Sequence, residues 1–232
     1  MSDRMSRWQS TEHLSAHAAT KLIDDVTKDV RRIMSQPPFD CSHDFTHIQR
    51  VVGLAEDLTA GERIQRPDVQ LDSLLITLTA MLHDIGDHKY ILPTSHPDVQ
   101  TATAESVLLS HSAPPALAST VQTLVSNVSC SYELAHPSAV EAVLARQPEL
   151  AVVQDADRLD AIGAVGIGRA FTYGGANGRT LAETRGVFEE RLLMREGMMR
   201  TALGKRMAGE RCERLREFLR WWGEELGGAR LS

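Results

Sequence analysis

The stretch SLLITLTAMLHDIG, residues 73–86, contains the most apolar run of this 232-residue chain and ends in a histidine and an aspartate. Its apolar side chains cover most of the circumference of a helix: Leu71, Leu74, Leu75, Leu78, Met81 and Leu82. The pattern therefore predicts a helix from Asp68 to Asp84 that runs through the centre of the molecule. Burying the ionisable pair of His83 and Asp84 beside these side chains is costly unless another group compensates it.

The sequence before this stretch also has helical periodicity. Apolar residues at three-and-four spacing predict a helix over residues 11–34, and the pair of prolines at 37–38 ends it. A second helix is predicted over residues 42–60, with Gly61 where a C-terminal cap is expected.

The sequence after the stretch continues the helical pattern. Residues 149–171 read as one long apolar helix, and the glycines of residues 173–179 predict a turn-rich loop. Two more helices are expected over residues 181–207 and 208–226.

These patterns together predict an all-α fold. Aromatic residues make up only 5% of the chain, which favours helical packing of aliphatic side chains. The sequence has no repeat and no Gly/Ser linker, so we expect one domain over residues 1–232. Its core would span about residues 41–175, with the C-terminal helices of residues 181–226 packed on it.

Composition and charge exclude several classes of function. The formal net charge of −6 makes duplex nucleic acid an unlikely partner, since such binding depends on neutralising phosphates. No apolar stretch approaches the roughly 20 residues of a membrane span, and the first residues carry no signal-peptide pattern. The three widely spaced cysteines fit reduced thiols. We therefore expect a cytoplasmic protein without a membrane partner.

Three separate segments offer metal ligands: SHDFTHIQR (42–50), MLHDIGDHK (81–89) and VQDADRLD (153–160). On a helix, His43, His47 and Arg50 share one face because they are four and three residues apart. One cation would account for all three segments. Imidazole and carboxylate ligands without thiolates suit Mn, Fe, Co, Ni, Zn or Mg.

The order of these segments resembles the HD superfamily of metal-dependent phosphohydrolases. The resemblance rests on HIQRV (47–51), LHDIG (82–86) and DADRLDAIG (155–163), and it covers about residues 41–175. The stretch of residues 155–175 resembles in particular the small stand-alone HD hydrolases, which include bacterial nucleotide pyrophosphohydrolases. The resemblance implies a single-domain helical bundle with a metal site in its centre.

By position, the resemblance assigns the metal ligands to His47, His83, Asp84 and Asp157. Asp155 competes with Asp157 for the last place, because side chains two residues apart on a helix point to different faces. The implied cofactor is one divalent metal ion, with Mn favoured among Mn, Co, Ni, Fe, Zn and Mg.

The resemblance also suggests roles around the metal. Arg50 matches an arginine that contacts phosphate or orients the site, and Asp87 is either a general base or a hydrogen-bond acceptor that orients a ligand histidine. His43 and Lys89 are expected to contact the substrate. Two weaker candidates for phosphate contacts are Arg158 and Arg169.

The implied function is metal-assisted hydrolysis of a nucleotide or another small phosphate ester, with pyrophosphohydrolysis of a nucleoside triphosphate favoured. Two alternatives stay open: a di-iron oxygenase that would draw on His111 and His136, and a non-catalytic module that binds a nucleotide. The charged C-terminal helices also leave open the pairing of two copies into a homodimer.

Overall fold

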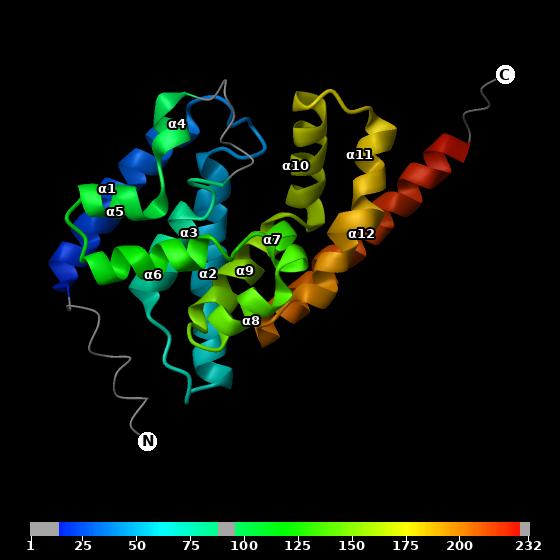
Figure 1. The fold of residues 1–232 in the computed structure, drawn as a ribbon. Helices are drawn as coiled ribbons and strands as arrows, with labels where there is room; N and C mark the ends of the chain where they lie inside the picture. Colours follow the sequence, from blue (N-terminus) through cyan, green and yellow to red (C-terminus); the bar gives the residue numbers. More distant parts are fainter. Residues whose placement is uncertain (1–13, 88–95, 228–232) are drawn as a thin grey trace.

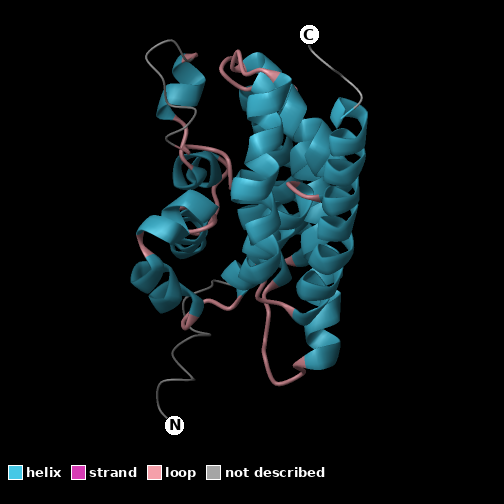
Figure 2. Ribbon diagram, turned by 90° about the vertical axis from the view of Figure 1, so that its right-hand side faces the viewer, coloured by secondary structure: helices cyan, strands magenta, loops and turns pink. Residues whose placement is uncertain are grey.

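The computed structural model describes residues 14–87 and 96–227, and all the secondary structure in these ranges is helical (Figures 1 and 2), as predicted. In chain order the α-helices are α1 (Ala16–Met34), α2 (Phe45–Gln65), α3 (Ser73–Leu82), α4 (Pro97–Thr101), α5 (Ala104–Ser110), α6 (Pro115–Val125), α7 (Cys130–Ala135), α8 (Pro137–Leu144), α9 (Glu149–Asp160), α10 (Gly163–Ala176), α11 (Leu181–Val187) and α12 (Ala202–Gly227). No helix among the described residues is long and apolar enough to cross a membrane.

Helix α3 lies at the centre of the fold, as its composition predicts. It packs against α1, α2, α6 and α9, and its residues Leu78, Ala80 and Leu82 are completely buried. The helix begins later than expected because the Asp72 carboxylate accepts hydrogen bonds from the backbone N–H groups of residues 74 and 75. The apolar run thus carries its last residues, and the histidine that follows, into the middle of the molecule.

Helix α2 continues past Gly61 to Gln65, so the predicted C-terminal cap at this glycine is wrong. A Cβ atom built on Gly61 would lie 3.1 Å from the Leu203 side chain of α12. The glycine therefore serves the close packing of α2 against α12 instead of ending the helix.

The predicted long helix over residues 149–171 is also wrong, because the chain breaks between α9 and α10. Gly163 at the break has a φ of +76°, a left-handed conformation that favours glycine. A Cβ on Gly166 would lie 2.3 Å from the carbonyl oxygen of Ala161, so the turn also depends on this second glycine. Helix α10 then extends through residues expected to form a loop and lies beside α11 (Figure 1).

The C-terminal region differs from the two expected helices. After α11 comes a π-helical turn, Phe188–Leu192, followed by a 3₁₀ segment, Leu193–Met198. Helix α12 then runs unbroken from Ala202 and packs against α2, α9 and α10. The C-terminal helix thus begins before residue 208, and it packs against other helices, as expected.

Candidate metal centre

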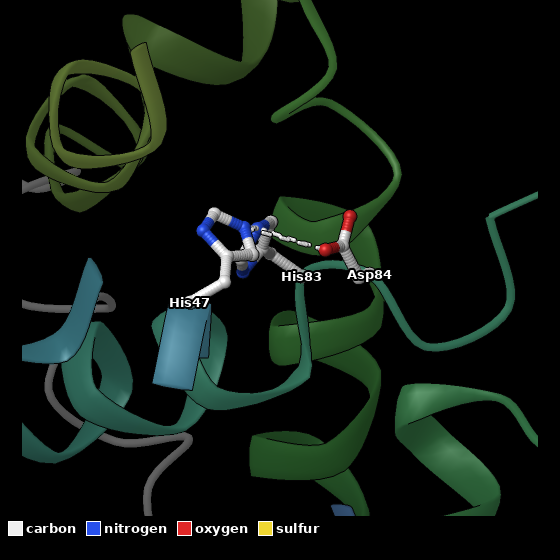
Figure 3. Close-up of side chains that lie close together, drawn as sticks. All are labelled: His47, His83 and Asp84. Atoms are coloured by element: carbon white, nitrogen blue, oxygen red, sulfur yellow. Dashed lines mark hydrogen bonds and ion pairs between the residues drawn. The ribbon is translucent and has the colours of Figure 1, made fainter. Parts of the chain in front are cut away.

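Three buried side chains meet where α2 and α3 converge: His47, His83 and Asp84 (Figure 3). The Nε2 atoms of the two histidines are 3.1 Å apart. The Oδ2 atom of Asp84 lies 3.4 Å from Nε2 of His47 and 3.5 Å from Nε2 of His83. Among the described residues, this trio is the group whose ligand atoms are close enough to share a metal ion.

Hydrogen bonds on the far side of each ring fix the orientation of both histidines. Nδ1 of His47 lies 2.8 Å from an Asp160 carboxylate oxygen, and Nδ1 of His83 lies 2.8 Å from the carbonyl oxygen of Ala80. Both partners are acceptors, so each Nδ1 holds a proton, and in the neutral ring that binds a metal each Nε2 would present a lone pair to the common point. This arrangement is the usual one for histidines that bind a metal.

The donor atoms fit a divalent ion. Two nitrogen ligands bound at about 2.1 Å and at a right angle to each other lie about 3 Å apart, close to the 3.1 Å between the two Nε2 atoms. The Oδ2 atom of Asp84 is buried without a hydrogen-bond partner, a costly state that a cation would relieve.

The electrostatics also favour positive charge at this point. Burial alone would lower the pKa of His83, but the carboxylates of Asp84 and Asp157 raise it to about 9. Burial would raise the pKa of Asp84, but the nearby histidines hold it well below its usual range. The two carboxylates therefore stay ionised and attract a cation.

Asp157 and Asp155, the two candidates for the last ligand, point to different places. Oδ1 of Asp157 lies 3.8 Å from Nε2 of His47 and 3.7 Å from Nε2 of His83. The Asp155 carboxylate instead accepts hydrogen bonds at the start of α12, from the backbone N–H groups of Arg200 and Thr201 and from the Thr201 hydroxyl. Asp155 therefore anchors α12 to α9 and is not available to a metal at the histidines.

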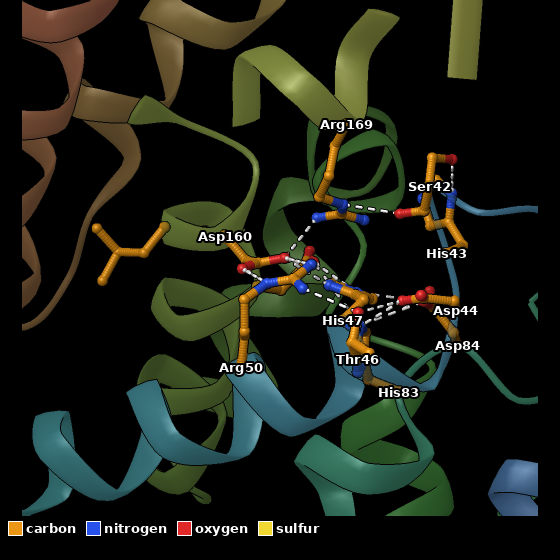
Figure 4. A network of polar contacts seen from close by, with 12 residues as sticks. Ser42, His43, Asp44, Thr46, His47, Arg50, His83, Asp84, Asp160 and Arg169 are labelled. Carbon is orange, nitrogen blue, oxygen red and sulfur yellow. Dashed lines mark hydrogen bonds and ion pairs between the residues drawn. The ribbon is translucent and has the colours of Figure 1, made fainter. Parts of the chain in front are cut away.

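Asp160 contacts His47 and two arginines beside the candidate centre, a position that the sequence analysis did not predict. Besides His47, its carboxylate accepts two hydrogen bonds from Arg50, at 2.7 and 3.0 Å, and one from Arg169 at 2.9 Å (Figure 4). Burial alone would raise the pKa of Asp160, but His47 and Arg50 lower it to about 2. Its place one helical turn after Asp157 was the available signal, because residues three apart share a helix face.

The two arginines on Asp160 have different surroundings. Arg50 also donates to the Thr46 hydroxyl and does not line the cleft described below, so its geometry fits the orienting role. Arg169 donates to the carbonyl oxygen of Ser42 and does line the cleft. A third candidate, Arg158, is fully buried and pairs instead with Glu133.

A cleft of about 200 Å³ opens beside the histidines and aspartates. Its walls come mainly from α10 and from the chain between α10 and α12, and it is lined by His43, Asp84, Asp157, Ala161, Gly166, Arg169, Ala170, Tyr173, Arg179, Thr184, Val187, Arg191, Leu192 and Arg195. His43 therefore borders the cleft, in edge-to-face contact with Tyr173. Arginine is the recurrent charge of this lining, which suits an anionic ligand.

The remaining predicted residues lie elsewhere. Asp87 follows Asp84 after a turn at Gly86 and is not among the residues that line the cleft. Lys89 lies outside the described residues. His111 pairs with Asp29 of α1, so the described part of the chain does not bring it to the metal centre.

His136, the other histidine of the di-iron interpretation, packs its ring against Tyr132 and is not part of the buried trio. The positions of His111 and His136 thus give no support to a second metal site of the kind a di-iron oxygenase requires.

Comparisons with known proteins agree with this geometry. The HD domain family model matches residues 44–162, which include all four residues at the proposed centre. The uncharacterized protein YpgQ of Bacillus subtilis is 30% identical over 196 residues, covering 80% of this chain and 85% of YpgQ.

Solved structures show the same fold. The crystal structure of B. subtilis YpgQ in complex with ADP has a TM-score of 0.68 at 28% identity and covers 91% of this chain and 98% of that one. An HD-superfamily hydrolase from Bacillus thuringiensis has a TM-score of 0.56 at 25% identity, covering 91% of this chain and all of its own. With the family model matching half of its length and its histidines and aspartates gathered at one buried point, this chain belongs to the HD domain family.

Proposed function

We propose that this protein is a metal-dependent phosphohydrolase that acts on a nucleotide, with a nucleoside triphosphate the favoured substrate and Mn the favoured metal. The observation that carries the proposal is the pair of buried Nε2 atoms, 3.1 Å apart, beside the Oδ2 of Asp84, which is buried without a hydrogen bond. A centre of this kind at the edge of an arginine-lined cleft suits a phosphorylated ligand.

Two different comparisons support the two parts of this proposal, hydrolysis and nucleotide binding. One structural neighbour is described as an HD-superfamily hydrolase, and YpgQ has been crystallised with ADP. We infer that the cleft of this chain accepts a related ligand.

In this proposal His47, His83, Asp84 and Asp157 hold one divalent ion. When bound, such an ion acts as a Lewis acid toward a phosphate oxygen and lowers the pKa of a water molecule. Asp160 holds His47 in the tautomer that leaves Nε2 free, and Ala80 does the same for His83.

Proton transfer and contacts to the phosphate groups are assigned to side chains around the substrate. In hydrolysis, a water oxygen bonds to phosphorus while the bond from phosphorus to the leaving oxygen breaks. Asp87 is our candidate for the base that accepts the proton of this water, which then passes to the leaving group or to solvent. His43 and Arg169, which line the cleft, are placed to contact phosphate oxygens.

The test compares the wild type with His83→Ala and Asp84→Ala. Release of phosphate and pyrophosphate is measured on a panel of nucleoside mono-, di- and triphosphates with Mn, Co, Ni, Zn and Mg. We expect bound metal and hydrolysis to disappear together in both variants while circular dichroism still shows a helical protein. His111→Ala, a histidine outside the centre, serves as control and should keep both properties.

Absence of turnover with every metal, in a folded wild type that binds metal, would contradict the proposal. Recovery of bound nucleotide unchanged after long incubation would instead support the non-catalytic module.

A further inference from the structure

Three arginines of the cleft, Arg179, Arg191 and Arg195, come from the chain beyond the matched HD region, which ends at residue 162. We call them the arginine cluster. Arg179 follows Gly178 in the turn between α10 and α11, and the other two lie in the irregular segment between α11 and α12. The cluster therefore lies outside the matched HD region and needs its own explanation.

Arg191 and Arg195 lack the partners that neighbouring arginines have. Nearby, Arg185 pairs with Glu189, and Arg216 pairs with Glu196. Arg191 and Arg195 have no side-chain hydrogen bond or ion pair within residues 14–87 and 96–227. Nε of Arg195 is moreover buried without an acceptor. A buried donor without a partner is costly, and an anion bound in the cleft would supply the missing acceptor.

The positions of the cluster define an order along the cleft. Arg195 lines the cleft together with Asp84 and Asp157 but does not line the outer hollow described next, which places it toward the metal centre. Arg179 and Arg191 also line a second, more open hollow that includes neither Asp84 nor Asp157. The order from the interior outward is therefore the metal centre, then Arg195, then the other two arginines.

The backbone of residues 188–198 suits the placement of Arg191 and Arg195 in the cleft lining. Residues 188–192 form a π-helical turn and residues 193–198 a 3₁₀ segment, so the helical register changes between Arg191 and Arg195. π-Helical turns often accompany functional sites. Arg179 is held over the Tyr173 ring, 5.4 Å from its centroid. Glu183 and Glu190 line the outer hollow as well. The Glu183 carboxylate accepts a hydrogen bond from the Thr180 hydroxyl.

We propose that the arginine cluster binds the phosphate groups that lie beyond the one at the metal centre, so that the cleft selects ligands with two or more linked phosphates over monophosphates. The proposal rests on the function proposed above and specifies its substrate class. The charge balance supports it, because a divalent ion would offset Asp84 and Asp157, the acidic residues of the cleft lining, whereas Glu183 and Glu190 line the outer hollow.

Binding by calorimetry tests this assignment with the Mn-loaded protein. The probes are AMP and α,β-methylene ADP, whose carbon bridge prevents cleavage between its two phosphates. The variants are Arg191→Gln and Arg195→Gln. The control is Arg206→Gln, which changes an exposed arginine of α12 outside the cleft.

We expect the wild type to bind the methylene ADP at least tenfold more tightly than AMP. Each cluster variant should lose about tenfold in affinity for the methylene ADP, the scale of one charge-assisted hydrogen bond, and stay within about twofold for AMP. Arg206→Gln should match the wild type.

Equal losses for both probes, or no loss for either, would overturn the role of the cluster. These results differ from failure of the proposed function, in which the wild type would bind no metal or would hydrolyse none of the nucleotide panel.

Discussion

At the scale of single residues, two buried aspartates on α9 have different partners: one contacts a histidine of the candidate metal centre, and the other contacts the start of α12. Asp160 accepts the Nδ1 proton of His47, and Asp155 accepts hydrogen bonds at the start of α12. Both are almost completely buried, so exposure does not distinguish them. Their partners do, and substitution of each by asparagine separates the two roles.

Asp160→Asn should weaken metal binding by about 10- to 100-fold, because His47 loses the carboxylate that fixes its tautomer and raises its basicity. Asp155→Asn is the matched control. It should keep the metal affinity of the wild type but lose about 1–3 kcal/mol of stability, since one buried acceptor of the α12 backbone is weakened. Competition with a chromogenic chelator measures the first effect, and urea unfolding measures the second. The reverse pattern would show that the roles are assigned wrongly.

A second residue-scale prediction concerns Asp87. The turn that carries it depends on Gly86, whose φ is +80° and on which a Cβ atom would lie 3.1 Å from the carbonyl oxygen of Ala102. As a general base, Asp87 would contribute about 10²- to 10⁴-fold to the rate. We expect Asp87→Asn to lower kcat by at least about 10²-fold with unchanged metal content. A lower metal content with a nearly normal kcat per bound metal would instead assign Asp87 to orienting the ligands.

At the scale of elements, the cleft depends on how closely α10 and α11 approach each other. A Cβ on Gly174 of α10 would lie 2.1 Å from the Thr184 hydroxyl of α11, whereas a Cβ on the adjacent Gly175 would meet nothing within 4 Å. Thr184 also lines the cleft. The glycine therefore sets the separation of two helices that form one wall.

Gly174→Ala should push these helices apart and cost about 1–3 kcal/mol of stability through overpacking. The affinity for α,β-methylene ADP should fall, while the metal content should stay the same because none of the ligands lies on either helix. Gly175→Ala, with open space around its new methyl group, should bind the probe like the wild type. Equal affinities of the two variants would show that the separation of α10 and α11 does not control binding.

The elements also show what the sequence could predict. The apolar run ending in His83 predicted a central helix, and α3 confirms it because its side chains are buried on nearly every side. The positions at which helices end or continue were harder to predict. Gly61 resembles a cap but serves a close contact with Leu203, and Gly163 interrupts a run whose apolar pattern continues through it. In both cases tertiary contacts decide what a glycine does, and the local pattern does not contain them.

The same limit applies to the site. The resemblance to the HD superfamily assigned the ligands to His47, His83, Asp84 and Asp157 by position in the motifs, with Asp155 competing for the last place. Asp160 and Arg195 were not found, since their roles depend on partners distant in sequence. A separation of 113 residues lies between Asp160 and the His47 ring it orients. Arg195 comes from an irregular segment whose backbone no periodicity describes.

At the scale of the whole molecule, the candidate metal centre draws its residues from helices that are distant in the chain. His47 belongs to α2, His83 and Asp84 follow α3, and Asp157 belongs to α9, and these three helices pack against one another. An ion bound at this point would connect all three in the folded state and none of them in the unfolded chain. By mass action, metal binding must then stabilise the fold.

Adding Mn at about 100 times its dissociation constant should therefore raise the stability by about 2.7 kcal/mol. For a chain of this size, about 1 kcal/mol shifts the melting temperature by about 2–4 °C, so we expect an increase of roughly 5–10 °C, reversed by EDTA. His83→Ala should melt at the same temperature with and without Mn, because it removes a ligand from the centre of the three helices. A metal-dependent shift that persists in His83→Ala would locate the stabilising ion elsewhere, and the histidines and aspartates of α2, α3 and α9 would then need another explanation.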